Sequence, residues 1–329
     1  MRRDVEAYVR SCKLCQQFKA STQKPGGLMR PIVVNEPWNT VGIDLTGPLP
    51  KTRRGNSFIL VVIDYFTKWI ELFPLANTKA KTIAQVFVDE VLCRFRFPVR
   101  VISDNGVQFL SNIFTNVCLA LDIKHQRTPL YHPQSNLCER VNRTIKPLLA
   151  ALTYNDNKSW DIKLPQIAFA LLTALSDSTE QSPAFLMFDR HPRQPLDLCL
   201  PSPAPLDQSP TETDLLDYRK QLLADLLPAY ASTREILDIS HQKQADQYNQ
   251  YHRSLQFEPD DLVWITALSG IAMGKWRGKK LSARRAGPYR VMERLSSLTY
   301  SLIHTITGQE LSPIHVNCLE RYYSFNSID

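Results

Sequence analysis

The stretch TVGIDLTG, residues 40–47, is the first of three segments that decide the fold, and each segment carries one acidic residue. Asp44 ends this apolar run, Asp104 ends a second run in VRVISDNGVQF, and Glu139 lies near the start of a helical pattern in YHPQSNLCERVNRT. Side chains at strand ends can gather at one edge of an α/β sheet. Carboxylate oxygens are the ligands that Mg²⁺ prefers, so the three acids predict a magnesium site at that edge.

Each acid also has a structural explanation. Asp is a common turn residue at strand ends, which would account for Asp44 or Asp104 taken singly. Asn136 could cap a helix with Glu139 at its third position, a variant of the capping box. The occurrence of all three acids in order, each within a longer motif, favours the metal-site interpretation.

Apolar and β-branched runs predict four strands, and residues 76–95 show helical spacing. The first two strands are joined by the short polar turn KTRRGNS and should pair antiparallel. The fourth strand can run parallel to the first and bring Asp104 beside Asp44, whereas Asp64 ends at the opposite edge. The strands are expected at 41–45, 58–64, 69–75 and 98–103.

A helix is predicted over residues 137–154, with Glu139 in its first turn. Apolar residues at helical spacing would pack against the sheet; they are Val141, Ile145, Leu148 and Leu152. The opposite face would be wet and basic and would offer a metal ligand and contacts to DNA; its residues are Glu139, Asn142, Arg143 and Lys146. Pro147 should weaken or kink the helix.

Composition and charge suit a nucleic-acid partner. The chain has 329 residues and a formal net charge of +7, and it is long enough for two to four compact units. Residues 275–290, KWRGKKLSARRAGPYR, hold seven basic residues and no acidic one, which indicates phosphate contact, although a mobile basic loop is the alternative. The DNA-binding candidates here are Lys275, Arg277, Lys279, Lys280, Arg284 and Arg285.

Seven cysteines and the lack of a signal-peptide pattern indicate a reducing intracellular compartment. Cys12 and Cys15 form a CxxC pair, which is half of a zinc site, a redox motif or a chance spacing. No histidine precedes residue 125, so a four-ligand zinc site cannot close locally and structural zinc is not expected. No run of about 20 apolar residues occurs, so no membrane-spanning helix is expected.

The second half of the chain predicts a helical segment and then a small β domain. Residues 212–250 are expected to form two helices separated at Pro228, acting as a spacer or an oligomerisation element. From residue 256 onward, apolar and polar residues alternate at strand spacing. Trp264 and Tyr289 are expected in the core of this domain rather than on DNA.

The motifs DLTGPLP, VVIDYFTKWIELFPL, ISDNGVQF, YHPQSNLCERVNRTIK and AGPYRV together resemble the integrase of gypsy-type LTR retrotransposons and their host-domesticated relatives. The resemblance implies an α/β fold with a ribonuclease-H-like mixed-sheet core and flanking helices, followed by a helical segment and a small SH3-like β-barrel. The implied segments are a truncated zinc-module remnant at 1–30, the catalytic core at 38–195, a helical linker at 205–252 and the barrel with the Gly-Pro-Tyr motif at 256–323.

The same resemblance implies a D, D, E triad on Asp44, Asp104 and Glu139, holding two Mg²⁺ or Mn²⁺ ions. Cys12 and Cys15 would be an incomplete zinc site. The 34 residues between Asp104 and Glu139 are one fewer than in most of the family. Polar residues in the loops beside the acids would position DNA, although the second of these loops could simply shape a turn; they are Asn105, Tyr131, His132 and Gln134.

The implied function is metal-dependent trimming of retroelement DNA ends and their joining to double-stranded target DNA, by a homo-oligomer in the nucleus. The alternative is a domesticated, catalytically silent DNA-binding protein. A ribonuclease H would share the acidic cluster but would not explain the basic C-terminal domain. Whether Met1 is the natural start stays open.

Overall fold

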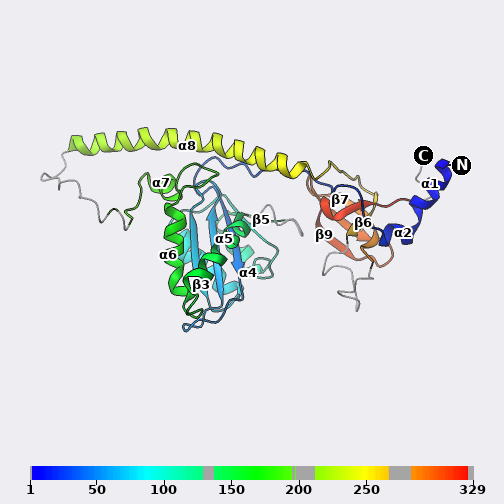
Figure 1. Ribbon diagram of the computed structural model, residues 1–329, viewed down its shortest axis with the longest axis horizontal. Helices are drawn as coiled ribbons and strands as arrows, with labels where there is room; N and C mark the ends of the chain where they lie inside the picture. The colour runs from blue at the N-terminus through cyan, green and yellow to red at the C-terminus, as the bar shows by residue number, and fades with distance from the viewer. Residues whose placement is uncertain (1, 129–136, 195–196, 198–211, 267–282, 325–329) are drawn as a thin grey trace. The chain divides into compact units, whose positions relative to one another are not determined.

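A computed structural model describes residues 2–128, 137–194, 197, 212–266 and 283–324 (Figure 1). The chain divides into two compact units, one formed by residues 32–128 and 134–242, the other by residues 1–31, 129–133 and 243–329. None of the described helices combines the length and the apolar character that crossing a membrane requires.

The first unit is built on a mixed five-stranded sheet with strand order β3-β2-β1-β4-β5. β1 pairs antiparallel with β2 and parallel with β4, as the sequence predicts. The sequence does not predict β5, because KHQR is polar and lacks the apolar residues of a typical strand. A polar strand is suited to its place at the edge of the sheet. The strands are β1 (Thr40–Thr46), β2 (Phe58–Asp64), β3 (Ile70–Leu75), β4 (Arg100–Ser103) and β5 (Lys124–Arg127).

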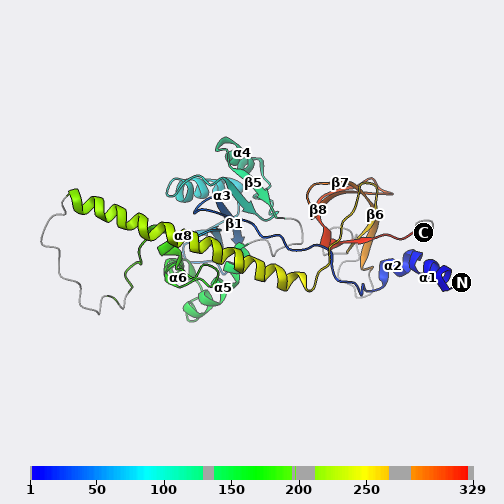
Figure 2. The same cartoon turned by 90° about the horizontal axis from the view of Figure 1, so that it is seen from above.

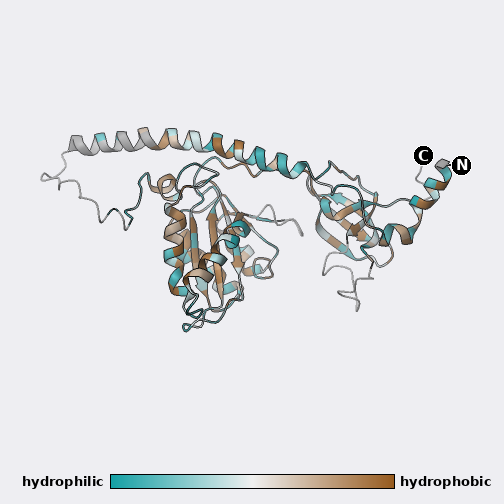
Figure 3. Cartoon of the chain, in the orientation of Figure 1, coloured by the Kyte–Doolittle hydropathy of each residue, from teal (hydrophilic) through white to brown (hydrophobic). Residues whose placement is uncertain are grey.

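Helices cover both faces of this sheet (Figure 2). Alternate residues of β2 explain the two layers, since Leu60 packs with one apolar cluster and Val61 with the other. Figure 3 shows apolar strands in this sheet and helices that carry both polar and apolar residues. One face carries α3 (Ala80–Val86), a π-helical turn (Phe87–Leu92) and α4 (Asn112–Ala120); the other carries α5 (Leu137–Leu152) and α6 (Trp160–Thr173). α7 (Pro183–Phe188) packs against α6.

α8 (Glu212–Asn249) is one helix of 38 residues with Pro228 inside it. The predicted break at Pro228 is therefore wrong. Proline has no backbone N–H, so the carbonyl four residues before Pro228 lacks its helical partner. Pro228 and Leu227 are exposed, so this carbonyl can bond to water. Within the first unit, α8 packs Leu237 into a buried cluster and donates a hydrogen bond from Tyr230 to the Leu186 carbonyl at 3.0 Å.

The second unit contains an all-antiparallel five-stranded sheet with order β10-β6-β7-β8-β9. Trp264 and Tyr289 are 1% and 2% exposed, which confirms that both lie in the core. Two N-terminal helices, α1 (Arg2–Ser11) and α2 (Lys13–Phe18), belong to this unit. The strands are β6 (Leu262–Thr266), β7 (Arg285–Arg294), β8 (Thr299–His304), β9 (Glu310–His315) and β10 (Leu319–Arg321).

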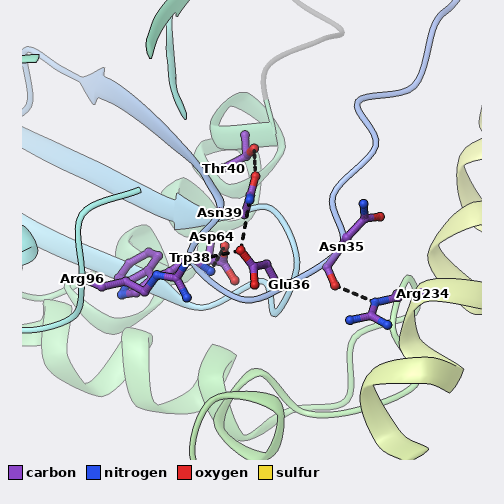
Figure 4. A network of polar contacts seen from close by, with 8 residues as sticks. All are labelled: Asn35, Glu36, Trp38, Asn39, Thr40, Asp64, Arg96 and Arg234. Carbon is purple, nitrogen blue, oxygen red and sulfur yellow. Dashed lines mark hydrogen bonds and ion pairs between the residues drawn. The ribbon is translucent and has the colours of Figure 1, made fainter. Parts of the chain in front are cut away.

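A buried carboxylate fixes the segment that leads into β1 (Figure 4). Asp64 is fully buried, and its Oδ1 accepts a hydrogen bond from the Trp38 backbone N–H at 2.9 Å. Its Oδ2 accepts from the Thr67 N–H at 2.8 Å and from the Thr67 hydroxyl at 2.7 Å. Burial raises the pKa of Asp64 although these donors oppose the shift. Asp64 therefore has a structural role.

A second set of polar contacts lies on the surface beside Asp64 (Figure 4). Glu36 accepts a hydrogen bond from Asn39 at 3.2 Å and pairs with Arg96 at 3.2 Å. Arg234 of α8 donates to the Asn35 carbonyl at 2.6 Å. These contacts hold the residues that precede β1 against neighbouring elements of the first unit.

We expect Asp64→Ala to lower the free energy of unfolding of the first unit by about 2–4 kcal/mol, because three buried donors lose their acceptor. Urea unfolding followed by tryptophan fluorescence measures this change. Glu36→Gln is the control, since it alters an exposed pair and should change stability by less than about 0.5 kcal/mol. Equal effects of the two variants would contradict the structural role of Asp64.

Candidate functional site

The register of the first sheet brings two of the predicted acids together. Ile43 of β1 is the parallel partner of Ser103 of β4, so Asp44 and Asp104 both come next, at the same edge of the sheet. Asp64 pairs with Val41 at the other end of β1. The predicted separation of Asp44 from Asp64 is thus confirmed.

A close approach of α5 to β1 places Glu139 near this edge. A Cβ atom on Gly42 would lie 2.8 Å from the Cys138 sulfur and 2.9 Å from the Tyr65 ring. Only glycine leaves room for the first turn of α5 at this distance from the strand. The contact sets both the height of α5 along β1 and its rotation about its own axis.

The rotation of α5 differs from the predicted one. Ile145 is buried as expected, but Leu148 and Leu152 are 37% and 49% exposed. The buried face runs through Cys138, Asn142, Ile145 and Leu149. The prediction that Leu148 and Leu152 pack in the core is wrong, because the contact of Cys138 with β1 turns both side chains toward solvent.

Because of this rotation, Asn142 lies on the buried face of α5 and not on the exposed basic face. It is 6% exposed, and its Nδ2 donates a hydrogen bond to Asp44 Oδ2 at 2.9 Å. Asp44 Oδ1 accepts a second bond from the Leu45 backbone N–H at 2.8 Å. Asn142 therefore orients Asp44, which corrects the prediction of a direct DNA contact.

Asp104 and Glu139 are close enough to Asp44 to influence it electrostatically. The pKa of Asp44 is raised to about 6, chiefly by burial, next by the negative charge of Asp104 and to a smaller extent by that of Glu139. The hydrogen bonds from Leu45 and Asn142 oppose this shift. The cluster is thus an acidic site where the ionised form of Asp44 is disfavoured unless a cation compensates it.

Asp44 is contacted by Asn142 and feels the charges of Asp104 and Glu139, whose oxygens are donors of the kind that Mg²⁺ prefers. Asn142 Oδ1 is buried and has no hydrogen-bond partner among the described residues, which adds an unsatisfied oxygen beside the acids. Asp104 Oδ1, in contrast, accepts from the Gly106 N–H of its own loop at 3.0 Å. In the described part of the chain, no three or more His, Cys, Asp or Glu side chains are arranged as a ready-made metal site.

Residues that the sequence did not single out hold the loop after β4. The Ser103 hydroxyl donates to the Asp104 carbonyl at 2.9 Å and lies 2.8 Å from His125 Nε2. Asn105 donates its side-chain amide to the Thr128 carbonyl, so this predicted DNA residue is engaged within the fold. A histidine in the polar KHQR segment was the only sequence signal for this arrangement.

The remaining DNA residues predicted in and before α5 fall into two groups. Arg143 and Lys146 are exposed on α5, and their contact with DNA stays a prediction. Tyr131, His132 and Gln134 lie outside the described residues.

In the second unit, Arg285 is a buried structural residue. It is 7% exposed, forms an ion pair with Glu320 at 2.8 Å and donates to the Lys19 carbonyl at 2.9 Å and to the Gln16 carbonyl. Its guanidinium is therefore not presented to phosphate, contrary to the prediction, whereas Arg284 is exposed. Four further candidates lie outside the described residues, namely Lys275, Arg277, Lys279 and Lys280.

The CxxC pair lies at the start of α2. Cys12 precedes the helix, Cys15 follows within its first turn, and both are free thiols. The backbone N–H of Cys15 is the main cause that lowers the pKa of Cys12. The expected lack of structural zinc stays a prediction.

Comparison with known proteins finds relatives of the part of the chain that contains Asp44 and Asp104. Residues 35–133 match the integrase core domain family. The chain is 24% identical over 330 residues to the retrovirus-related Pol polyprotein from transposon 412 of Drosophila melanogaster, covering 98% of this chain and 25% of that protein. It is 25% identical over 328 residues to the transposon Tf2-3 polyprotein of Schizosaccharomyces pombe, covering 98% of this chain and 23% of that protein. The chain thus spans about a quarter of the length of these relatives.

A solved structure has a fold similar to that of this chain. The simian T-cell lymphotropic virus intasome in complex with PP2A regulatory subunit B56 gamma contains a chain that matches with a TM-score of 0.58 and 16% identity. The match covers 98% of this chain and 91% of that chain. Residues 35–133 thus resemble an integrase core domain, and the chain as a whole resembles part of retrotransposon polyproteins and has a mixed α/β integrase fold.

We expect Asp44→Asn to stabilise metal-free protein at pH 7.5 but not at pH 4. The folded-state pKa of Asp44 lies above its ordinary value of 3.8, so the cost of its ionisation appears as pH rises toward about 6 and persists above it. The gain in stability should be on the order of 1–3 kcal/mol, because the charge whose burial costs this free energy is removed. The hydrogen bond to residue 44 is kept, since the Asn142 amide can flip to match the new side chain. Thermal melting in EDTA measures the gain, and Mg²⁺ should then stabilise only the wild type.

Asp89→Asn is the matched control for this prediction, since it removes an exposed acid from the same unit. A pH-independent difference between wild type and Asp44→Asn would contradict the electrostatic origin of the effect.

We expect Arg285→Met to destabilise the second unit by about 2–4 kcal/mol, because Glu320 and two carbonyls lose a buried partner. Arg284→Gln removes the same charge from the neighbouring exposed position and should change stability by less than about 0.5 kcal/mol. Urea unfolding of both variants measures the difference. Equal stability of the two would show that the Arg285 contacts contribute nothing to folding.

Proposed function

We propose that the chain is a DNA integrase of the gypsy retrotransposon type. It would perform metal-dependent 3′-end processing and strand transfer of retroelement DNA into target DNA. The observation that carries this proposal is the parallel pairing of Ile43 with Ser103, which delivers Asp44 and Asp104 to one edge of the sheet. The hydrogen bond from Asn142 to Asp44 ties α5, and with it Glu139, to the same place.

The chemistry requires a water molecule or a DNA 3′-hydroxyl to attack a phosphodiester. Two Mg²⁺ or Mn²⁺ ions, when bound, would activate that nucleophile and stabilise charge on the leaving oxygen. Asp44, Asp104 and Glu139 would hold these ions. Asn142 and the Leu45 N–H keep the Asp44 carboxylate in a fixed orientation at this edge.

The acidic cluster supports this role energetically. Burial and the neighbouring charges of Asp104 and Glu139 disfavour the ionised form of Asp44. A bound divalent cation would offset both the loss of hydration and the repulsion between the acids. Metal affinity should therefore be pH-dependent, rising as Asp44 loses its proton.

The finer assignments belong to the same proposal. The mixed sheet would be ribonuclease-H-like, and the antiparallel sheet of the second unit would be an SH3-like barrel that binds DNA. An intasome among the structures with this fold, and transposon polyproteins among the relatives, support double-stranded DNA as partner and assembly of several copies. Action in the nucleus is part of the same proposal. Residues 1–30 would be a zinc-module remnant and residues 205–252 a linker.

A second candidate function is a catalytically silent DNA-binding protein. One observation favours it, because Asp104 Oδ1 is bonded to the Gly106 N–H of its own loop. A carboxylate held in this way would have to rotate or share that oxygen to bind an ion.

The deciding experiment is strand transfer by the purified full chain. The substrates are a 3′-recessed duplex and a supercoiled plasmid target, with Mg²⁺ or Mn²⁺. We expect Asp104→Asn to lose roughly 100-fold or more of the joined product, because it removes one metal-binding carboxylate. Asp122→Asn is the control, because it changes an exposed aspartate at the far end of β5 and should stay within twofold of wild type.

Equal product from wild type and Asp104→Asn would rule out the proposed site. Lack of product from every variant, with DNA binding intact, would favour the silent DNA-binding protein.

A further inference from the structure

The loop between β1 and β2, residues 47–57, exposes basic side chains that the proposed catalytic site does not use. Lys51, Arg53 and Arg54 are all exposed. Arg53 forms an ion pair with Asp156 at 2.9 Å. Lys51 and Arg54 make no ion pair with any residue that the structure describes. The tip of the loop therefore carries a local excess of positive charge.

A buried acid on α6 fixes the conformation of this loop. Asp161 is 5% exposed, and its Oδ2 accepts from the Thr52 hydroxyl at 3.1 Å and from the Asn56 side-chain amide at 2.9 Å. Trp160 adds a bond from Nε1 to the Pro50 carbonyl at 2.7 Å. Because the side chains that hold the loop point inward, the basic residues are displayed on a preorganised backbone.

The turn between α5 and α6 extends the same surface. The Arg53 N–H donates to the Lys158 carbonyl at 3.2 Å, and Asp156, two residues after Tyr154, pairs with Arg53. Tyr154 is 88% exposed, and Lys158 is exposed as well. We call the combined surface the hairpin patch; it consists of Lys51, Arg53, Arg54, Tyr154 and Lys158.

The hairpin patch lies beyond the acidic edge along β1. The strand passes Asp44, ends at Thr46 and continues directly into the loop. At about 3.3 Å per strand residue, Thr46 is only about 7 Å further along than Asp44. β4 runs parallel to β1 and delivers Asp104 to this same edge.

We propose that the hairpin patch binds the sugar-phosphate backbone of DNA next to the phosphate held at Asp44 and Asp104. Phosphates of one strand follow each other at about 3.4 Å along the duplex axis, so a strand at the acids carries further phosphates past the loop. The cations supply sequence-independent contacts, and the exposed side chain of Tyr154 can donate a hydrogen bond from its hydroxyl to a phosphate oxygen. The inference rests on the proposed function only for the choice of DNA as ligand.

The test is DNA binding by the full chain in EDTA, where catalysis is not required. Fluorescence anisotropy with a labelled duplex, over a series of salt concentrations, compares wild type with the double variant Lys51→Gln, Arg54→Gln. The expected result is roughly tenfold weaker binding at low salt and a salt slope smaller by about two, because two phosphate contacts are lost.

The matched control is the double variant Arg96→Gln, Lys124→Gln. It removes the same charge from exposed positions at the opposite end of the same sheet, where Arg96 makes only a surface pair. Its affinity should stay within about twofold of wild type. Equal loss of affinity in both double variants would overturn the proposal, since net charge alone would then explain the effect.

Lysine acetylation of the unaltered protein is an independent measurement. Bound duplex should protect Lys51 and Lys158 from reagent but leave Lys124 reactive, as read by mass spectrometry. Unprotected Lys51 in saturated complex would overturn the proposal. If strand transfer fails while this protection is seen, the catalytic proposal fails and the hairpin patch stands.

Discussion

The packing of the first turn of α5 on β1 is the constraint on which the rest of the site depends. Gly42 has no side chain, and Cys138 occupies the space that a Cβ would need. This contact fixes where α5 lies along the strand, which face it buries and therefore that Asn142 meets Asp44. Sheet pairing alone delivers two acids, and the glycine contact supplies the third.

The acidic edge is a place where folding brings together groups that repel each other. Asp44 is held in a partly buried position beside two other acids, and its raised pKa reflects the resulting cost. The surrounding core, with fully buried Ile43, Leu60 and Val61, provides the stability that offsets this cost. Asp64 shows the contrasting case, since its buried carboxylate is surrounded by donors and serves the fold alone.

Strand positions and register could be predicted from the sequence because apolar runs and the short turn KTRRGNS leave few topologies for β1, β2 and β4. The rotation of α5 could not, since helical spacing allowed several apolar faces and only the contact between Gly42 and Cys138 selects one. The continuity of α8 through Pro228 depends on solvent exposure, which a sequence does not display. Arg285 was assigned to DNA by its basic neighbours, whereas its partners Glu320 and the carbonyl of Lys19 are distant in the chain.

The attachment of the loop at residues 47–57 to Asp161 has an evolutionary consequence. Surface loops ordinarily accept insertions and deletions, because few contacts depend on their length. Here Thr52, Asn56 and Pro50 must each reach a fixed partner on α6. Related chains that keep an acid at the position of Asp161 should therefore keep the length of this loop, even where its exposed residues have diverged.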